Sequence, residues 1–177
     1  MIKTQPNLQD ETISLRMLTM EDTEALFKMR SDKDLCRKAG LTIDTHPAHT
    51  FSFILDVQRK VKSRYFYYWG IFKEDTLVGV ISLWGIDYDE KSGELGYFIG
   101  REYQRQGYMT KAIKLVVNYV LENTKILRVN AYVETSNKAS MKLTEKLGFK
   151  LVGQSVEEDL SDAFVPMYQY EIKESIV

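Results

Sequence analysis

The amino-acid sequence predicts one α/β (α+β) domain in which helices flank a mixed β-sheet. Three observations support this. Strand-like runs are interspersed with runs of helical spacing, two early strands form a hairpin, and a strand–helix–strand–helix–strand unit follows. The 177 residues are a common domain length, and no repeat or Gly/Ser-rich linker divides them. We therefore expect a single domain over residues 1–177.

The first part of the chain predicts a strand and two helices. Residues 12–18 alternate apolar and polar side chains, as in a half-buried strand. Thr19 begins a helix, with Asp22 three residues later in a near capping box. Pro47 marks the first turn of a second helix, because proline is favoured there. Residues 32–45, between the two helices, are expected to be irregular.

The middle of the chain predicts three strands and the longest helix, followed by another strand. Residues 65–72 and 77–84 are aromatic and β-branched runs separated by a short polar turn, which predicts a hairpin. A third strand is expected over residues 94–100. Residues 107–123 then carry apolar side chains at helical spacing, and residues 126–135 return to a strand pattern.

The last part of the chain predicts one helix and two strands. The helix is expected over residues 137–147 and ends before Gly148, since glycine is favoured just past a helix C-terminus. Residues 150–156 and 164–172 are expected to be the final strands. The acidic segment from Glu157 to Asp162 is expected to be the loop that joins them.

Composition argues against several classes of protein. Lys and Arg number 24 against 25 Asp and Glu, so the chain lacks the basic surplus typical of DNA-binding proteins. The lone Cys36 excludes an intrachain disulfide, and His46 with His49 lacks a third ligand, so no metal site is predicted. The start of the chain has no apolar signal region, and no apolar run reaches membrane-spanning length. We expect a soluble cytoplasmic protein with no membrane partner.

The stretch before the longest helix predicts an anion-binding loop. A helix N-terminus has unpaired N–H groups and a partial positive charge, and both favour a phosphate. Gly107 would let a ligand approach the backbone closely, and Arg105 would add charge. The alternative is a loop that only turns the chain. The sequence contains neither a dinucleotide-binding nor a P-loop fingerprint.

An ordered set of motifs resembles the GNAT acyl-CoA N-acyltransferase superfamily. The segment Q-x-x-G-x at Gln104–Met109 precedes N-x-x-S, which begins at Asn137, and then a helix ending in K-L-G-F. The phrases E-L-G-Y-F-I, Q-G-Y-M-T-K-A and N-K-A-S resemble the RimJ/RimL-like branch of that superfamily. The resemblance extends from Leu15 to Tyr170 and so includes nearly the whole chain.

The resemblance implies a sheet that splays between two central strands and holds acetyl-CoA in the gap. Phe98 and Ile99 would lie on the strand whose backbone pairs with the pantetheine arm. Asn137 would contact or help to place the pantetheine, or would only cap its helix. The pyrophosphate loop would comprise Arg105, Gln106, Gly107, Tyr108, Met109 and Thr110. Met109 is a departure, since many members have Gly or Ala there, although some RimL-like members also carry Met.

The resemblance also implies direct attack of an amine on the thioester, with two side chains in chemical roles. We expect Glu94 to be the base, since strand alternation puts it on the same side as Gly96 and Phe98. The alternative is an ordinary solvent-facing glutamate. Many superfamily members have a tyrosine where this chain has Thr144, whereas RimL-like proteins have a serine at the position of Ser140. The resemblance therefore implies that Ser140 is the proton donor or thiol partner. The alternative for Ser140 is capping of the first helical turn.

Three functions remain open for this chain. The leading hypothesis is acetylation of a protein N-terminal α-amine, with ribosomal proteins as the substrate class that the resemblance implies. An α-amine has a pKa of about 7.7–8.0, and a lysine or polyamine amine has a pKa of about 10.4. A larger fraction of an N-terminal substrate is therefore neutral near pH 7, and a weaker base is sufficient to deprotonate it. The alternatives are acetylation of a small amine (polyamine, amino sugar or antibiotic) and a non-catalytic acyl-CoA sensor. The protein would be a monomer or a homodimer.

Recognition of the acceptor is the least readable feature of the sequence. Five aromatic residues are candidate walls of the acceptor site: Tyr65, Tyr67, Trp69, Trp84 and Tyr88. About half of them are expected in the core, because strand faces alternate. The acidic residues Glu157, Glu158, Asp159 and Asp162 would either attract a cationic acceptor or form a solvated loop.

Overall fold

The computed structural model describes residues 5–158 and 163–177. In these residues, eight strands form one mixed sheet in the order β1-β2-β3-β4-β5-β6-β8-β7. The strands are β1 (Leu8–Gln9), β2 (Ser14–Arg16), β3 (Tyr67–Lys73), β4 (Thr76–Asp87), β5 (Ser92–Ile99), β6 (Arg128–Glu134), β7 (Lys150–Glu158) and β8 (Phe164–Ile172). Neighbouring strands run antiparallel except β5 and β6, which are parallel.

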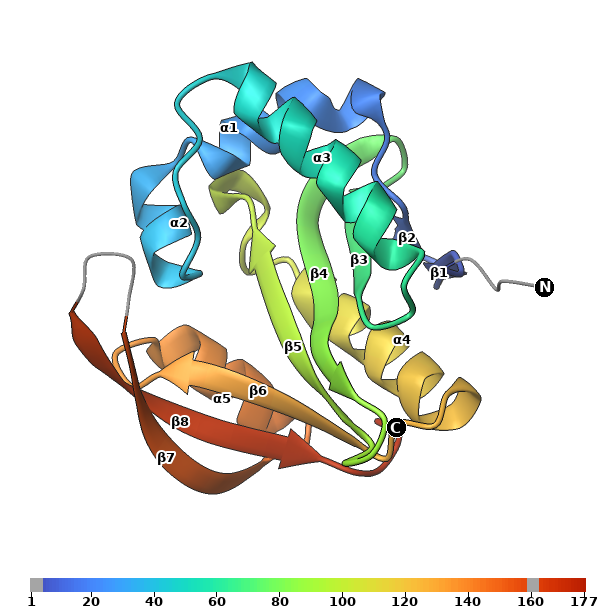
Figure 1. Ribbon diagram of the computed structural model, residues 1–177, viewed down its shortest axis with the longest axis vertical. Helices are drawn as coiled ribbons and strands as arrows, with labels where there is room; N and C mark the ends of the chain where they lie inside the picture. Colours follow the sequence, from blue (N-terminus) through green and yellow to red (C-terminus); the bar gives the residue numbers. More distant parts are fainter. Residues whose placement is uncertain (1–4, 159–162) are drawn as a thin grey trace.

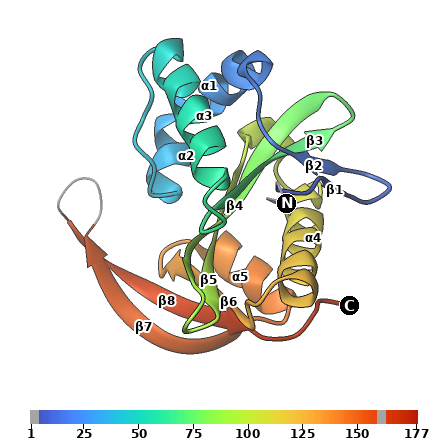
Figure 2. The same cartoon turned by 45° about the vertical axis from the view of Figure 1, so that its right-hand side comes forward.

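Helices cover both faces of the sheet (Figures 1 and 2). The described residues contain five α-helices: α1 (Thr23–Arg30), α2 (Lys33–Lys38), α3 (Pro47–Val61), α4 (Tyr108–Asn123) and α5 (Lys138–Lys146). Two 3-10 turns, η1 (Met20–Asp22) and η2 (Arg101–Tyr103), precede α1 and α4. The helices α1, α2 and α3 lie on one face, and α4 and α5 lie on the other, so the chain is an α+β domain.

Each face of the sheet has its own hydrophobic core. The core under α1–α3 includes Leu26, Ile54 and Val57, all nearly inaccessible to solvent. The core under α4 and α5 is larger and includes Trp69 and Val116. Side chains of β5 divide between the two cores, because alternate strand residues point to opposite faces.

The sheet splays where β5 meets β6. Their parallel pairing extends over three positions, from Ser92 with Arg128 to Glu94 with Asn130. Beyond Glu94, β5 stays paired with β4 as far as Ile99, whereas β6 turns away toward β8 (Figure 1). The edge of β5 that faces β6 therefore has no strand partner in this part of the described structure.

Two sets of ion pairs attach the turn η2 to the first helices. Arg101 makes two contacts of 2.6 Å with the carboxylate of Asp32 at the start of α2. Lys28 on α1 contacts Glu102 at 3.0 Å. The segment that leads into α4 is thereby linked to α1 and α2.

Most predicted elements are confirmed, and one prediction about the first part of the chain is wrong. Thr19 and Asp22 form the expected capping box, in which the Thr19 N–H donates to the Asp22 carboxylate at 2.7 Å. Residues 32–45, however, are not irregular throughout, because they contain α2. The Asp32 carboxylate accepts a hydrogen bond from the Leu35 N–H at 3.0 Å and so caps this short helix.

The predicted acidic loop near the C-terminus is shorter than expected. Glu157 and Glu158 belong to β7, where they pair with Val165 and Phe164 of β8. Asp159 and Asp162 lie outside the described residues. The two glutamates are consequently held on a strand, and the sequence pattern missed this because charged residues are unusual in strand interiors.

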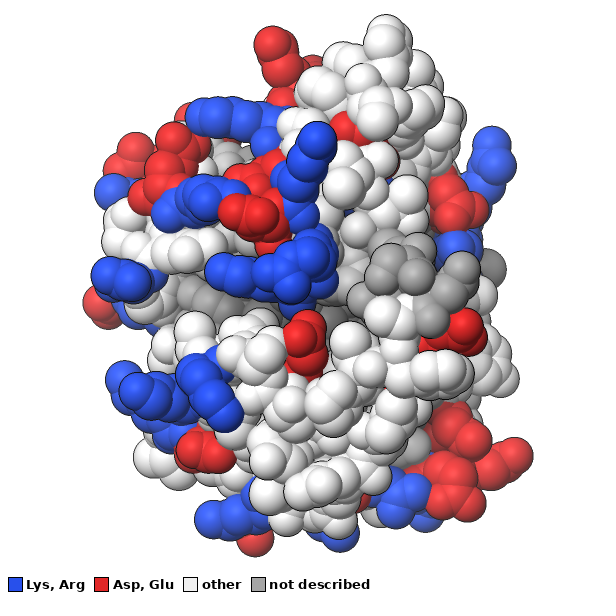
Figure 3. Space-filling model, turned by 90° about the vertical axis from the view of Figure 1, so that its left-hand side faces the viewer, with Lys and Arg blue, Asp and Glu red and all other residues white. Residues whose placement is uncertain are grey.

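Positive and negative side chains are mixed on the face of the molecule that Figure 3 shows. Figure 3 shows Lys and Arg in both the upper and the lower half of this face, with Asp and Glu among them. Within residues 5–158 and 163–177, no helix is both long enough and apolar enough to span a membrane.

Candidate active site

The end of the β5–β6 pairing brings Glu94 and Asn130 together. They are Cα partners in the parallel register, so both side chains leave the sheet on the same face. Val129 and Ala131, on either side of Asn130, are buried in the core under α4 and α5, which places Asn130 on the opposite face. The Asn130 Oδ1 atom is buried and has no hydrogen-bond partner. A buried acceptor of this kind favours a ligand that brings hydrogen-bond donors.

Burial changes the acidity of Glu94. The side chain is half-buried, and desolvation raises its pKa from 4.5 to about 7, with a further contribution from the negative charge of Glu157 on β7. The same two carboxylates also raise the pKa of Tyr132 on β6, although burial is the main cause of that shift. Glu94, Tyr132 and Glu157 are thus electrostatically coupled, and Glu94 can exchange a proton near neutral pH.

The loop before α4 has an unusual backbone. Arg105 has φ 61° and Gly107 has φ 83°, both in the left-handed region. Arginine rarely adopts this conformation, and such strain is concentrated at functional sites. A Cβ added to Gly107 would have no atom within 4 Å, so the space beside this glycine is open. The geometry leaves room for a ligand at the backbone.

The N-terminus of α4 is suited to an anion. Gly107 is its N-cap and supplies no capping side chain, and the first turn contains no acidic residue. The side chains of Tyr108 and Met109 are buried in the core. A phosphate at this helix terminus could therefore bind their backbone N–H groups but not their side chains. Thr110 is half-buried, and Gln106 donates its side-chain amide to the Glu102 carbonyl at 2.9 Å.

Phe98 and Ile99 lie on β5 beyond its divergence from β6. Phe98 is buried in the core under α1–α3, and Ile99 packs against the opposite core. Their backbone pairs with Val80 and Gly79 of β4 on one side. The other side of this segment of β5 has no strand partner, and there the Ile99 carbonyl accepts only a long hydrogen bond from the Gln104 side-chain amide, at 3.4 Å.

The first turn of α5 contains Asn137 and Ser140. The Asn137 Oδ1 atom accepts a hydrogen bond from the Ser140 N–H at 3.1 Å. Asn137 therefore caps this helix, which is one of its two expected roles. The Ser140 Oγ atom lies 2.6 Å from the phenol oxygen of Tyr97 on β5. This contact joins β5 to α5 across the region where β5 and β6 diverge.

Thr144 takes no part in this constellation. It is fully buried, and its hydroxyl donates to the backbone carbonyls of Met141 at 2.9 Å and Ser140 at 3.0 Å. Its hydroxyl is used within α5, as is common for threonine in a helix.

The five candidate aromatic walls separate into core and surface residues. Trp69 is fully buried, and Tyr67 stacks on it with ring centroids 5.5 Å apart. Tyr65 is exposed and packs edge-to-face on Tyr88. Trp84 is 46% exposed and is the Cα partner of Glu94 on β4. Of the five, Trp84 is therefore the one that adjoins the candidate active site.

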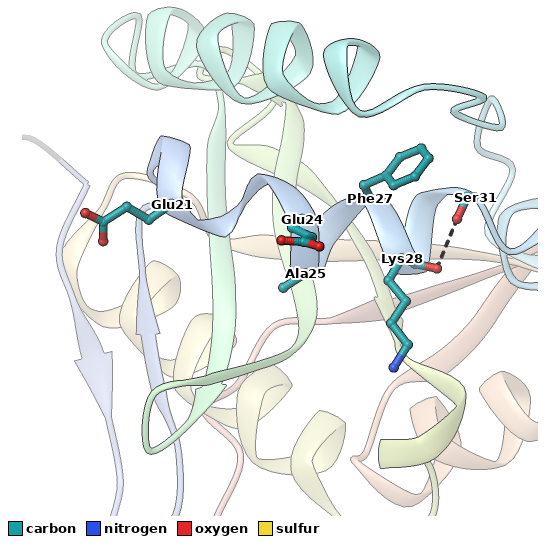
Figure 4. A pocket seen from close by; sticks show the side chains of 6 residues that line it. All are labelled: Glu21, Glu24, Ala25, Phe27, Lys28 and Ser31. Carbon is teal, nitrogen blue, oxygen red and sulfur yellow. Dashed lines mark hydrogen bonds between the residues drawn. The ribbon is translucent and has the colours of Figure 1, made fainter.

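Other surface features lie away from this site. A hollow of about 670 Å³ on α1 is lined by Glu21, Glu24, Ala25, Phe27, Lys28 and Ser31 (Figure 4). It shares no residue with the splayed strands. The His46 Nδ1 atom caps α3 by accepting from the Ala48 N–H at 3.1 Å. Among the residues that the structure describes, no group of three His, Cys, Asp or Glu is placed to bind a metal.

Two residues of the site are absent from the sequence-based prediction. Tyr97 stands in the motif E-L-G-Y, but its contact with Ser140 spans 43 residues, and no local pattern reports it. Asn130 belongs to none of the motifs found in the sequence, and its position beside Glu94 depends on the parallel register of β5 and β6. Strand alternation does indicate that Tyr97 points away from the face of Glu94.

Comparisons with known proteins agree with this geometry. Residues 12–150 match the Acetyltransferase (GNAT) domain family. The "Uncharacterized N-acetyltransferase YoaA" of Bacillus subtilis (strain 168) is 31% identical over 150 residues, which cover 84% of this chain and 85% of YoaA. The ribosomal-protein-serine acetyltransferase of Escherichia coli (strain K12) is 32% identical over 95 residues, 53% of each chain.

Solved structures show the same fold. A RimL ribosomal alpha-N-protein acetyltransferase in complex with coenzyme A superposes with a TM-score of 0.85 at 19% identity, covering 96% of this chain and 99% of that one. A spermidine N-acetyltransferase from Vibrio cholerae, in complex with CoA and spermine, has a TM-score of 0.80 at 18% identity and covers 94% and 98% of the two chains.

The splayed sheet, the uncapped helix terminus and the matched family define the class of this protein. The chain belongs to the GNAT acetyltransferase family. It is an N-acetyltransferase, and two solved structures of the same fold are complexes with acetyl-CoA or coenzyme A.

Proposed function

We propose that this enzyme transfers the acetyl group of acetyl-CoA to the α-amine of a protein N-terminus, with ribosomal proteins as the substrate class. The observation that carries the proposal is the pKa of Glu94, which burial raises to about 7. An attacking amine must be neutral, and Glu94 would accept the proton that the amine loses. The similarity to the ribosomal-protein-serine acetyltransferase supports the substrate class.

The pKa of the base matches an α-amine better than a side-chain amine. An N-terminal α-ammonium has a pKa of about 7.7–8.0, close to that of Glu94, so proton transfer between them is nearly balanced. A lysine or polyamine ammonium has a pKa of about 10.4, and the same transfer would be uphill by about 3.4 pK units, or about 5 kcal/mol. Glu94 would therefore deprotonate an N-terminus much more readily than a polyamine.

The structure offers three groups of residues for acetyl-CoA. The open edge of β5 at Phe98 and Ile99 would pair with the pantetheine arm, which agrees with the divergence of β5 from β6. The loop Arg105–Thr110 and the N-terminus of α4 would take the pyrophosphate, which agrees with the open space at Gly107. Asn137 would help to place the pantetheine through its position at the start of α5.

The bound thioester supplies an activated acetyl carbon and a thiolate leaving group. Glu94 first takes a proton from the ammonium form of the acceptor and passes it to solvent, which leaves a neutral amine. The carbon–nitrogen bond then forms as the carbon–sulfur bond breaks, and the nitrogen gives up its second proton to Glu94. The electron pair of the carbon–sulfur bond remains on sulfur, and Ser140 donates a hydrogen bond to it. A thiol has a pKa of about 8.5, so a modest donor is sufficient.

A small cationic amine is the second candidate for the acceptor. The negative charge of Glu157 acts on Glu94, and Trp84, which is partly exposed, is the Cα partner of Glu94. Carboxylates and an indole together attract ammonium groups. The likeness in fold to a spermidine N-acetyltransferase agrees with this candidate, although identity of 18% shows the fold alone.

One assay distinguishes these functions. Thiol release from acetyl-CoA is measured near pH 7.5 with two acceptor pools: short peptides with free N-terminal Ser, Ala or Thr, and a mixture of polyamines, amino sugars and aminoglycosides. Release with the peptides alone is the expected result. Release with small amines alone would replace the first candidate by the second. Tight binding of acetyl-CoA without release in either pool would favour a narrower protein substrate or an acyl-CoA sensor.

A further inference from the structure

We propose that Tyr97 is a positioning residue for Ser140: its phenol donates a hydrogen bond to the Ser140 hydroxyl, which leaves the proton of the serine free for the leaving sulfur. The inference rests on the proposed function, because it assigns the partner of a group that this function uses. It adds a residue of β5 that no motif marks as functional.

The geometry of the pair is short and specific. The phenol oxygen of Tyr97 and the Ser140 Oγ atom are 2.6 Å apart, at the short end of the range for two hydroxyls. Tyr97 stands on the part of β5 beyond its last pairing with β6, and Ser140 is in the first turn of α5, the helix that follows β6. The hydrogen bond therefore connects β5 to the helix that follows β6, at the place where the two strands diverge.

Tyr97 is held rigidly enough to act as a support. Its ring packs against the large core under α4 and α5, together with Leu95 and Ile99 from the same strand. An aromatic ring fixed in this way has little freedom to follow a moving hydroxyl. The phenol oxygen therefore defines where the Ser140 oxygen lies.

The direction of the hydrogen bond follows from acidity. A phenol, with an ordinary pKa near 10, is more acidic than an aliphatic hydroxyl, so Tyr97 is the better donor of the two. Burial raises the pKa of Tyr97 further, and its proton therefore stays in place at physiological pH. Ser140 accepts this proton's hydrogen bond, and its own O–H remains available as a donor.

The rest of Ser140 is fixed as well. Its backbone N–H is bound to the Asn137 side chain, and its backbone carbonyl accepts from the Thr144 hydroxyl. In the described residues, the Ser140 hydroxyl has no protein partner other than Tyr97. One donor of the serine is thus left for a ligand.

The proton balance of the reaction is unchanged by this arrangement. The acceptor gives its two protons in turn to Glu94, and Glu94 passes each to solvent. The carbon–sulfur bond breaks with its electron pair on sulfur, which accepts the hydrogen bond of Ser140 and takes its proton from solvent. Tyr97 keeps its proton throughout, so no buried phenolate is formed.

The first test is a double-mutant cycle with Tyr97→Phe, Ser140→Ala and the double variant. Tyr97→Phe keeps the ring and removes one hydroxyl. We expect it to lower kcat roughly tenfold, below the full effect of a general acid, while the KM for acetyl-CoA stays the same. We expect the double variant to be no slower than Ser140→Ala, because residues that act as a unit are not additive.

Tyr170→Phe is the matched control. Tyr170 belongs to the same core, and its hydroxyl donates to the Glu145 carboxylate near the other end of α5 at 2.9 Å. Removal of that hydroxyl should cost similar stability in a thermal melt and leave kcat as in the wild type. A fall in kcat for both variants would assign the effect to the packing of α5 and overturn the proposal.

The second test measures the thiol of bound coenzyme A without turnover. Ultraviolet absorbance of the thiolate is followed against pH in the complex with coenzyme A. A hydrogen bond from Ser140 stabilises the thiolate, so the bound thiol should titrate below its ordinary pKa of about 8.5. Tyr97→Phe and Ser140→Ala should each raise this pKa, whereas Tyr170→Phe should not.

The outcomes separate this inference from the proposed function. Loss of activity in Ser140→Ala with full activity in Tyr97→Phe would overturn the role of Tyr97 alone. Full activity in Ser140→Ala would remove Ser140 from the mechanism and the inference with it. A larger defect in Tyr97→Phe than in Ser140→Ala, additive in the double variant, would show Tyr97 acting independently and would also overturn the proposal.

Discussion

The Cα partner of Glu94 on β6 is Asn130, and theirs is the last pair before the two parallel strands diverge. One position in the fold thereby combines a carboxyl whose pKa is raised to about 7 with a buried amide oxygen that has no partner. The branching point of the sheet is consequently rich in hydrogen-bond acceptors. A donor-rich group such as an amine fits this position.

The first prediction concerns Glu94 as the base. Glu94→Gln should lower kcat about 10²–10⁴-fold with little change in affinity for acetyl-CoA. In the wild type, kcat/KM should rise with pH through about 7, because the carboxylate is the active form. The variant should lose this limb and keep only the rise that comes from the acceptor α-amine, whose pKa is about 7.7–8.0. An unchanged limb would assign the titration to another group.

The second prediction concerns Glu157. Its negative charge is the second cause, after burial, of the raised pKa of Glu94. Glu157→Gln should therefore move the limb of the kcat/KM profile to lower pH. Glu158→Gln, on the neighbouring residue of β7, is the control that alters the same net charge. Equal displacement by both variants would indicate a general charge effect and not a specific coupling.

The third prediction concerns stability. The pKa of Glu94 is higher in the folded protein than the ordinary value of 4.5, so the folded state binds more protons in the window from about 4.5 to 7. This group's contribution to stability is complete at acid pH and is lost as pH rises through that window. Glu94→Gln should accordingly raise the Tm relative to wild type at about pH 8 more than at about pH 5. An equal difference at both pH values would contradict the raised pKa.

The fourth prediction tests the loop before α4. Gly107→Ala introduces a Cβ into open space, at φ 83°. We expect a large loss of acetyl-CoA affinity, because the methyl group would occupy the ligand's approach to the backbone. Gly148→Ala is the matched control, since Gly148 has φ 90° and equally open surroundings. Both variants bear a similar backbone strain of about 1–2 kcal/mol. Calorimetric titration with acetyl-CoA should separate them, and equal affinities would refute the loop assignment.

The fifth prediction compares a buried with an exposed ion pair. Arg30 and Asp44 form a buried pair at 2.7 Å, and Thr50 also donates to Asp44. Asp44→Asn should destabilise the fold by about 3–5 kcal/mol, since it leaves the Arg30 charge uncompensated. Glu102→Gln, which breaks the exposed pair with Lys28, should change the stability little. Urea denaturation measures both, and similar costs would contradict the assigned burial.

Local sequence patterns predicted most of the fold. The long apolar face of α4 and the Asn137 cap of α5 are properties of short segments, and both are confirmed. The helix α2 was missed because it has six residues and only Leu35 and Cys36 as buried apolar positions. Periodicity cannot be recognised over so short a stretch.

The site was predicted less completely because parts of it depend on contacts between distant segments. Strand alternation indicated the face of Glu94, but its raised pKa depends on burial and on Glu157 from another strand. The approach of Tyr97 to Ser140 depends on how α5 packs beside β5, and the position of Asn130 depends on a parallel register. Tertiary packing sets these distances, and one sequence does not report them.

The parallel pairing of β5 and β6 extends over three positions, and this short pairing affects the dynamics of the sheet. Backbone amides on an open strand edge exchange their hydrogens with water quickly, since little protects them. A ligand arm bound along β5 would connect the two parts of the sheet that diverge between β5 and β6. Addition of coenzyme A should therefore slow hydrogen exchange in both β5 and β6, which would make the co-substrate a temporary part of the protein's scaffold.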